Sequence, residues 1–296
     1  MSKAEHTPII SVIIPVWNDS KRIIRCIDAL KRQSLARHLF EIIVIDNVST
    51  DNTYEVLSRI DGISLLQESK PGSYAARNKA INIAKGTYLA FTDSDCLPDK
   101  KWLEELISCA QSDDKIGIVA GDIAFFQDPE DNVEKEALAF ESLFSMNQES
   151  YADEGLCITA NWCSRKKVVL AQSGFRTDLK SGGDHDMARK ITASGLEVKY
   201  CENAKVLHPA RNSTELLKKR RRVIGGAWDK NNSSFKPLRM LINSCKLFLK
   251  RFCRVITAPK YSIYQKTRIV EILLRILWAS MSEIFKLAFG KESSRS

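Results

Sequence analysis

The chain of 296 residues lacks the features of several common protein classes. Its eight cysteines form no Cys-x-x-Cys pair and no regular spacing, which argues against a disulfide scaffold or a zinc site and favours reduced thiols. It has no run of about 18 uncharged apolar residues that would predict a transmembrane helix. The first residues, "MSKAEHTP", do not resemble a signal peptide. We therefore expect a cytoplasmic protein.

Charge is distributed unevenly along the chain. Residues 1–204 contain 24 Lys and Arg against 31 Asp and Glu, a net charge of −7. Residues 205–296 contain 21 against 5, a net charge of +16. An acidic front and a basic back predict two regions with different partners.

Short runs rich in β-branched residues alternate with helical patterns in the front of the chain. The predicted strands are 10–14, 41–45, 63–66 and 87–92, and the predicted helices are 21–32, 52–59 and 74–84. This alternation predicts βαβ units and an α/β fold, with a mostly parallel central sheet covered on both faces.

Ligands of such sheets bind beyond the carboxyl ends of the strands, so the segments that follow the strands are informative. These segments include "PVWNDS" (15–20), "DNVSTDNT" (46–53) and "TDSDCLP" (92–98). None contains G-x-G-x-x-G or G-x-x-x-x-G-K-[ST], which argues against a dinucleotide site and a P-loop. Each contains carboxylates or amides instead. Asp93 and Asp95 stand one residue apart, and their mutual repulsion predicts a cation nearby.

Five motifs in a fixed order resemble those of family 2 glycosyltransferases with the GT-A fold. They lie within about residues 8–210 and read "SVIIPVWND", "EIIVIDNVSTDNT", "PGSYAARNKAINIAKGTYLAFTDSDCLP", "TANWCSRKKV" and "SGGDHDMARK". The resemblance implies a nucleotide-diphosphate sugar donor, Mg²⁺ or Mn²⁺, and inversion at the sugar carbon. It also implies a hydroxyl acceptor on a glycan or a lipid-linked molecule, in surface polysaccharide or glycoconjugate synthesis.

The aspartates after the fourth strand are the predicted metal site. Mg²⁺ and Mn²⁺ prefer oxygen ligands, and the resemblance implies that Asp95 binds the metal while Asp93 lies near the ribose or the ion. The alternative is helix capping, but Asp99 is the better predicted N-cap of the next helix. In several relatives a histidine at the position of His208 completes the metal site. The adjacent Pro209 favours a structural turn as the alternative.

The resemblance also implies contacts with the nucleotide. It places Pro15, Asp46 and Asn47 beside the donor, with Asn47 where many relatives have a second aspartate, so the base is left open. An Asx turn is the alternative for this strand end. Arg77, behind a glycine at the start of a helix, is expected to bind phosphate. A surface arginine with a salt bridge to a neighbouring acid is the alternative.

Two further motifs complete the expected site. Asn161 and Trp162 resemble the loop that lines the donor sugar, with a core position as the alternative for Trp162. Relatives open a later helix with Glu-Asp, and here Gly183 and Asp184 take those places. The resemblance therefore implies that Asp184 accepts the acceptor's proton, with an N-cap role as the alternative and Asp186 as the next acid.

Residues 211–296 are predicted to be a basic helical region that follows a catalytic domain at 1–210. After "KKRRR" (218–222), a cationic strip at helical spacing runs through 236–256, and 267–289 has a narrow polar strip opposite a wide apolar face. Basic amphipathic helices lie in membrane interfaces. We expect this region to bind the anionic cytoplasmic face of a membrane. Packing on the catalytic core or in a homodimer is the alternative.

Two other functions are less consistent with these residues. A sugar-phosphate nucleotidyltransferase would carry a glycine-rich loop after the first strand, and "PVWNDS" contains no glycine. A nucleic-acid-binding protein would explain the basic region, but carboxylates at the strand ends repel phosphate. Nucleic acid is therefore not an expected partner.

Overall fold

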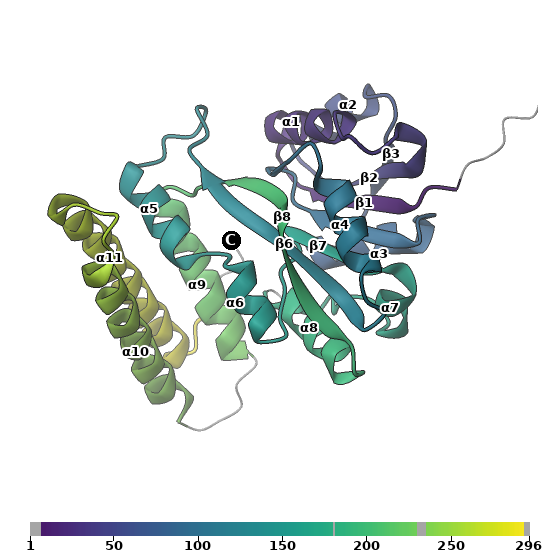
Figure 1. Cartoon of the computed structure of the whole chain (residues 1–296). Coiled ribbons are helices and arrows are strands. Elements are labelled where there is room, and N and C mark those ends of the chain that lie inside the picture. Colours follow the sequence, from purple (N-terminus) through teal and green to yellow (C-terminus); the bar gives the residue numbers. More distant parts are fainter. Residues whose placement is uncertain (1–6, 180, 230–234, 293–296) are drawn as a thin grey trace, which may run out of the picture. The chain divides into compact units, whose positions relative to one another are not determined.

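The computed structural model describes residues 7–179, 181–229 and 235–292 (Figure 1). The chain divides into two compact units. The first comprises the described residues up to Ala124, with Met146–Asp178 and Gly183–His208; the second comprises Phe125–Ser145, Leu179–Gly182 and the described residues from Pro209 onward. The first unit ends at His208, two residues before the end of the predicted catalytic domain at 210. Two segments from within that predicted domain belong to the second unit.

The front of the chain folds as its alternating pattern predicts. Each predicted strand and helix up to residue 92 is present, with bounds within two residues of the prediction. These elements are β1 (Ile10–Val16), α1 (Ser20–Lys31), β2 (Phe40–Asp46), α2 (Thr53–Ser58), β3 (Ser64–Gln67), α3 (Ser73–Ile83) and β4 (Tyr88–Thr92). The α/β fold class is therefore confirmed.

The strands form one eight-stranded sheet in the order β3-β2-β1-β4-β7-β6-β8-β5. β1 pairs in parallel with β2 and β4, and β2 pairs in parallel with β3. The other described pairings are antiparallel. β7 (Asn161–Arg165) pairs with β4 and with β6 (Ile116–Phe126), and β5 (Leu97–Pro98) pairs with β8 (Glu197–Pro209). The carboxyl ends of the four parallel strands meet at one edge, where a ligand site is expected.

Both faces of the sheet are covered, which explains the unbroken apolar runs. In β1, Val12 joins Ile10 and Ile14 in one apolar cluster, whereas Ile13 joins another. Successive side chains of a strand point to opposite faces. Helices α1 and α4 (Trp102–Gln111) pack in the first cluster, and α3 and α8 (Gly183–Ala193) pack in the second. The first unit also contains a 3₁₀ turn (Arg37–Leu39), α6 (Gln148–Asp153) and α7 (Lys166–Ala171).

The predicted N-cap of α4 is wrong. The helix begins at Trp102, with Lys101 at the N-cap position and no side-chain capping bond. Asp99 lies in the preceding turn, where its Oδ1 accepts the backbone N–H of Lys101 at 3.0 Å. Pairing of β5 with β8 holds the two residues before Asp99 in extended form, so the helix starts later.

The second unit is helical and consists of α5 (Lys135–Phe144), α9 (Ser213–Asp229), α10 (Lys236–Thr257) and α11 (Ile263–Ala288). α11 starts with a capping box, in which Ser262 Oγ accepts the N–H of Gln265 and the Gln265 side chain accepts the N–H of Ser262. α11 packs along both α9 and α10. Among the described helices, none has the length and apolarity that crossing a membrane requires.

A buried ion pair joins α5 to the start of α9. Glu141 is fully buried and accepts the backbone N–H of Arg211 at 3.0 Å, and its carboxylate lies 3.2 Å from Arg211 Nη1 and 3.7 Å from Lys219 Nζ. Burial by itself would raise the pKa of Glu141, but Arg211 and Lys219 outweigh it and hold that pKa below its ordinary value. Burial, with Arg211 nearby, lowers the pKa of Lys219 to about 8.

We expect Glu141→Gln to lower the free energy of unfolding by about 3 kcal/mol at neutral pH, because it leaves two partly buried cations without their buried carboxylate. Glu136→Gln on the same helix is the matched control, with an expected change below about 0.5 kcal/mol. The folded-state pKa of Glu141 is depressed, so its contribution is present above the unfolded-state value and is lost as pH falls through the folded-state value. Urea unfolding at several pH values measures both effects. Equal stability of the two variants at neutral pH would contradict this role.

Candidate active site

The loop after β4 contains Asp93 and Asp95, and a buried arginine compensates the first of them. Arg77 on α3 is 2% exposed, and its Nη2 lies 2.6 Å from Asp93 Oδ1. Arg77 was expected to bind phosphate directly. Its guanidinium pairs with a site aspartate from a buried position, and its contact with phosphate stays a prediction.

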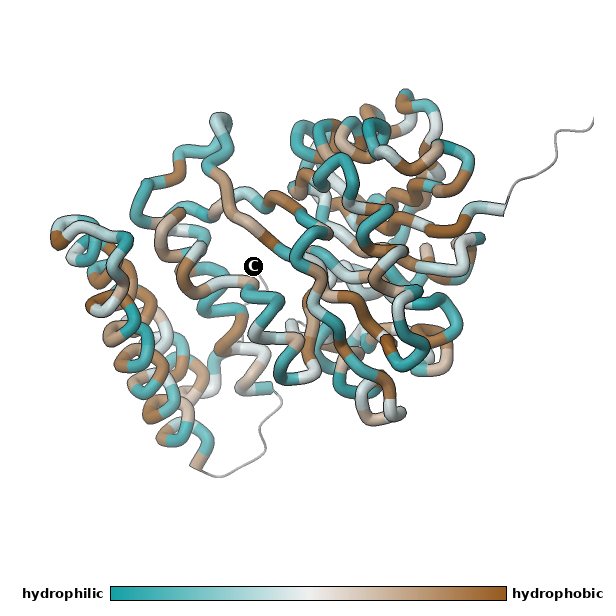
Figure 2. Tube along the Cα trace, viewed as in Figure 1, coloured by the Kyte–Doolittle hydropathy of each residue, from teal (hydrophilic) through white to brown (hydrophobic). Residues whose placement is uncertain are grey.

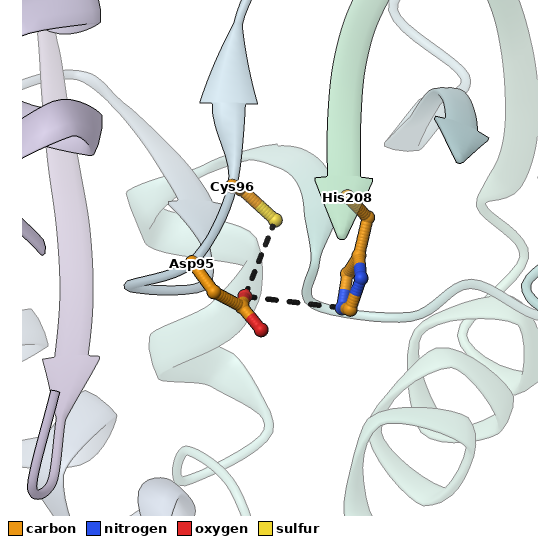
Figure 3. Close-up of side chains that lie close together, drawn as sticks. All are labelled: Asp95, Cys96 and His208. Carbon is orange, nitrogen blue, oxygen red and sulfur yellow. Dashed lines mark hydrogen bonds and ion pairs between the residues drawn. The ribbon is translucent and has the colours of Figure 1, made fainter. Parts of the chain in front are cut away.

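Strand pairing brings His208 to the second aspartate. β5 and β8 pair so that Leu97 lies opposite Leu207, and Cys96 and His208 directly adjoin this pair in the sequence. The His208 Nε2 atom lies 3.8 Å from Asp95 Oδ1 (Figure 3), and the His208 side chain is 2% exposed. Residues more than a hundred positions apart in the chain thus meet at one point.

Asp95, Cys96 and His208 form a candidate metal-ligand group. One ligand atom from each lies within 4.8 Å of the other two. A carboxylate and an imidazole are a donor set that suits Mn²⁺ and related ions, so the residues present fit a divalent cation. Asp93 contributes its carboxylate next to this group, held by Arg77.

Two buried thiols lie at this loop, and no role for either was predicted from the sequence. Cys26 on α1 and Cys96 are both fully buried, and Cys26 Sγ donates to the carbonyl of Asp93 at 3.6 Å. Burial, followed by the charges of Asp95 and Asp93, raises the pKa of both thiols. They are therefore neutral groups that pack under the carboxylates.

The ends of β1 and β2 are occupied by local hydrogen bonds. Pro15 is buried in β1 opposite Ile45. Asp46 is fully buried, and both of its carboxylate oxygens lie 3.3 Å from the N–H of Ser49, as in the predicted Asx-type turn. Asn47 accepts the N–H of Gly72 at 2.7 Å and donates to the carbonyls of Glu68 and Lys70 at 2.7 and 2.9 Å. These side chains shape the loop that leads into α3.

Asp184 lies in the first turn of α8 and is contacted by a residue that no motif had singled out. The Tyr74 hydroxyl donates to Asp184 Oδ1 at 3.3 Å and accepts the N–H of Gly183 at 2.9 Å. A Cβ atom on Gly183 would lie 2.6 Å from the Tyr74 ring. Gly183, where the family resemblance implies a glutamate, therefore makes room for this tyrosine.

Asp184 and the next acid of the helix, Asp186, have different partners. Burial, and next the Asp184 carboxylate, raise the pKa of Tyr74 to about 12, so the phenol keeps its proton and remains a donor. Asp186 instead lies 3.1 Å from Lys190 Nζ and 4.0 Å from Arg176 Nη1. Asp186 is therefore engaged by cations of the protein, whereas a neutral hydroxyl contacts Asp184.

Asn161 and Trp162 do not line an open site. Both are fully buried in β7. Asn161 donates to the carbonyls of Asp122 and Ala204 at 2.8 and 2.7 Å and accepts the indole N–H of Trp102 at 2.8 Å. The indole N–H of Trp162 donates to Ser164 Oγ at 2.7 Å. Core packing and internal hydrogen bonds occupy these side chains, as the alternative for Trp162 has it, and their contact with the donor sugar stays a prediction.

One helix connects the two halves of the site. Tyr74 and Arg77 stand three positions apart on α3, on neighbouring points of one helical face. Arg77 holds Asp93 and Tyr74 contacts Asp184, so the candidate metal loop and the candidate base are fixed by the same element.

Comparison with known proteins gives a consistent assignment. The model of "Glycosyl transferase family 2" matches residues 11–170. Glycosyltransferase AglE of Haloferax volcanii is 34% identical over 222 residues, which cover 73% of this chain and 72% of that protein. Poly(ribitol-phosphate) beta-N-acetylglucosaminyltransferase TarS of Staphylococcus aureus is 31% identical over 100 residues, which cover 32% of this chain and 18% of TarS.

Solved structures share the fold at low sequence identity. Mannosyltransferase PcManGT from Pyrobaculum calidifontis, in complex with GDP-Man and Mn²⁺, superposes with a TM-score of 0.56 at 18% identity and covers 96% of this chain and 76% of that chain. S. aureus TarS 1-349 in complex with UDP-GlcNAc superposes with a TM-score of 0.53 at 16% identity, with 95% and 92% coverage. The expected GT-A fold is confirmed.

Proposed function

The chain belongs to glycosyl transferase family 2, and from this premise we propose that it moves a sugar from a nucleotide-diphosphate donor to a hydroxyl of a glycan or lipid-linked acceptor. The observation that carries the proposal is the arrangement around α3. Through Arg77 and Tyr74 this helix holds an aspartate of the metal loop and the aspartate expected to act as base. Because the chain belongs to this family, we do not propose a nucleotidyltransferase or a nucleic-acid-binding function.

The donor diphosphate and a divalent cation are proposed to bind at the loop after β4. Asp95 and His208 would hold Mn²⁺ or Mg²⁺, with Asp93 beside them. When bound, the cation supplies positive charge that stabilises the departing diphosphate. Support for this donor class comes from two solved structures with this fold, one in complex with GDP-Man and Mn²⁺ and the other with UDP-GlcNAc.

Arg77 is proposed to act through Asp93. Its guanidinium is buried and already paired. It offsets the repulsion between the two loop aspartates before any ligand arrives. Arg77 is thus a positioning residue, whereas its motif predicted a phosphate ligand. Asp46 and Asn47 are proposed to shape the nucleotide's binding loop, and they leave the base open.

Asp184 is proposed to be the catalytic base. It accepts the proton of the acceptor hydroxyl as the oxygen attacks the anomeric carbon. The new bond joins the acceptor oxygen to that carbon, and the bond from the carbon to the phosphate oxygen breaks on the opposite side. The nucleoside diphosphate leaves with the bonding electrons, and a single displacement inverts the configuration. Tyr74 donates to the carboxylate and so fixes its orientation.

The acceptor is proposed to be lipid-linked and the enzyme to be peripheral on the cytoplasmic face of a membrane. The charge distribution supports this location, since the front of the chain at −7 would be repelled by anionic lipid and the back at +16 would be attracted. Synthesis of surface polysaccharide or of a glycoconjugate is the proposed setting.

A panel of sugar nucleotides tests the proposed reaction. With Mn²⁺ and a hydroxyl acceptor, we expect one or a few donors to give nucleoside diphosphate in step with a glycosylated product. The product's anomeric configuration, determined by NMR, should be opposite to that of the donor. A product that retains the configuration would contradict the single displacement, and a panel without turnover would contradict the function.

We expect Asp184→Asn to reduce kcat by roughly 10²–10⁴-fold, the usual contribution of a positioned base. Donor affinity should change little, because Asp184 is assigned to the acceptor. Asp186→Asn is the matched control on the same helix, and its effect on kcat should be much smaller, since Asp186 is paired with Lys190. A greater loss of kcat in the control would move the base to Asp186.

We expect Asp95→Ala to abolish transfer and His208→Ala to raise the Mn²⁺ concentration needed for half-maximal activity by at least about tenfold. The Asp95 side chain is 22% exposed on a loop, so its truncation leaves no cavity in the core. Circular dichroism of Asp95→Ala should therefore show a folded protein. Transfer that persists in EDTA would refute the metal's role.

A further inference from the structure

We propose that the outer face of α10 is the surface that docks this chain on an anionic lipid bilayer. This inference names the surface behind the membrane location given above, and its biological purpose rests on that proposed function. Its evidence is separate, because it comes from the second unit alone.

A continuous apolar strip runs along the exposed side of α10. Its large side chains are between 46% and 75% exposed and recur at intervals of three, four and seven residues, which places them on one face of the helix. The opposite side of the helix is buried and includes Met240, Ser244 and Val255. The strip, called the apolar strip below, consists of Phe235, Leu238, Ile242, Leu249 and Ile256.

A cationic strip lies directly beside the apolar strip. Four exposed cations occupy the helix face next to the apolar strip. They are Arg239, Lys246, Lys250 and Arg254. α10 contains no Asp or Glu. In the described part of the chain, no salt bridge joins these four cations to a carboxylate. Figure 2 shows hydrophobic and hydrophilic residues interleaved along α10.

The "KKRRR" run, which has the densest positive charge in the sequence, is not the better docking element. Lys219 is directed to the buried Glu141, 3.7 Å away. Arg220 Nε donates to Ser280 Oγ at 2.6 Å, and its Nη2 lies 3.4 Å from Ser244 Oγ, so this side chain points into the helical unit. Two of the five cations are thereby used internally, and the exposed remainder of α9 has no comparable apolar strip beside it.

Charge decides between a bilayer and a second copy of the chain as the occupant. The seven-residue repeat of Phe235, Ile242, Leu249 and Ile256 would suit a coiled coil. However, a pair of α10 helices would bring two cationic strips together with no acidic residue on either helix to compensate them. A bilayer containing anionic lipid complements both strips at once, with acyl chains for the apolar side chains and headgroups for the cations.

Vesicle co-sedimentation of the full chain tests the proposal. We expect binding to vesicles of phosphatidylcholine with phosphatidylglycerol, and much weaker binding to phosphatidylcholine alone. Lys246→Gln/Lys250→Gln should weaken partitioning by about 30-fold at low salt, from the loss of two surface cations. Ile242→Ser/Leu249→Ser should abolish the fraction that remains bound at high salt, because that fraction depends on apolar burial.

Lys218→Gln/Arg221→Gln on α9 is the matched control, with the same loss of charge at exposed positions. We expect it to weaken partitioning by less than about threefold, because screened charges without an adjacent apolar strip contribute little. An equal loss in the control and in the α10 variant would overturn the assignment to this face. No binding of the wild-type chain to anionic vesicles would overturn the proposal itself.

Two further measurements separate this inference from the proposed reaction. Analytical ultracentrifugation without lipid should show a monomer, and a dimer that Leu249→Ser dissociates would make a second copy the occupant and overturn the proposal. Release of nucleoside diphosphate with a soluble acceptor should be the same in the α10 variants and the wild type. Vesicle binding without any sugar-nucleotide turnover would refute the proposed reaction and leave the docking surface standing.

Discussion

The repulsion between Asp93 and Asp95 is the constraint on which the candidate site depends. A chain that ends a buried strand with two like charges must supply opposite charge or lose stability. Here Arg77 supplies it to Asp93 from a buried position on α3, and His208 approaches Asp95 from β8. The two aspartates therefore have different partners. One is compensated within the protein, and the other faces a group of ligand atoms suited to a cation.

This division also explains why the site needs elements from distant parts of the chain. α3 positions both Arg77 and Tyr74, so a shift of this helix would disturb the metal loop and the candidate base together. The short pairing of β5 with β8 carries His208 to the loop. Buried thiols underneath remain neutral and allow the carboxylates to sit close to the core without further charge.

Much of the fold could be predicted from the sequence, because the period of the apolar residues is local information. The parallel strands and the loops that follow them are examples, and the basic helices of the second unit are another. The partners of individual side chains could not be predicted. Asn161 and Trp162 lie within one of the five motifs, but only the antiparallel pairing of β7 shows that both are buried. No motif predicted the role of Tyr74. The only indication was Gly183, which lies against the Tyr74 ring in the fold and has no side chain to displace it. Likewise, nothing local reveals that Lys219 and Arg220 turn inward.

Calorimetric titration of a nucleoside diphosphate into the protein tests the central claim, that the loop after β4 is built for a diphosphate bridged to the protein by a divalent cation. UDP and GDP should each be tried, with Mn²⁺ and with EDTA, on the wild type and on Asp95→Ala. The account predicts that at least one of the two nucleotides binds the wild type only when Mn²⁺ is present, and that Asp95→Ala removes this dependence together with most of the affinity. Equal affinity in Mn²⁺ and in EDTA would contradict it.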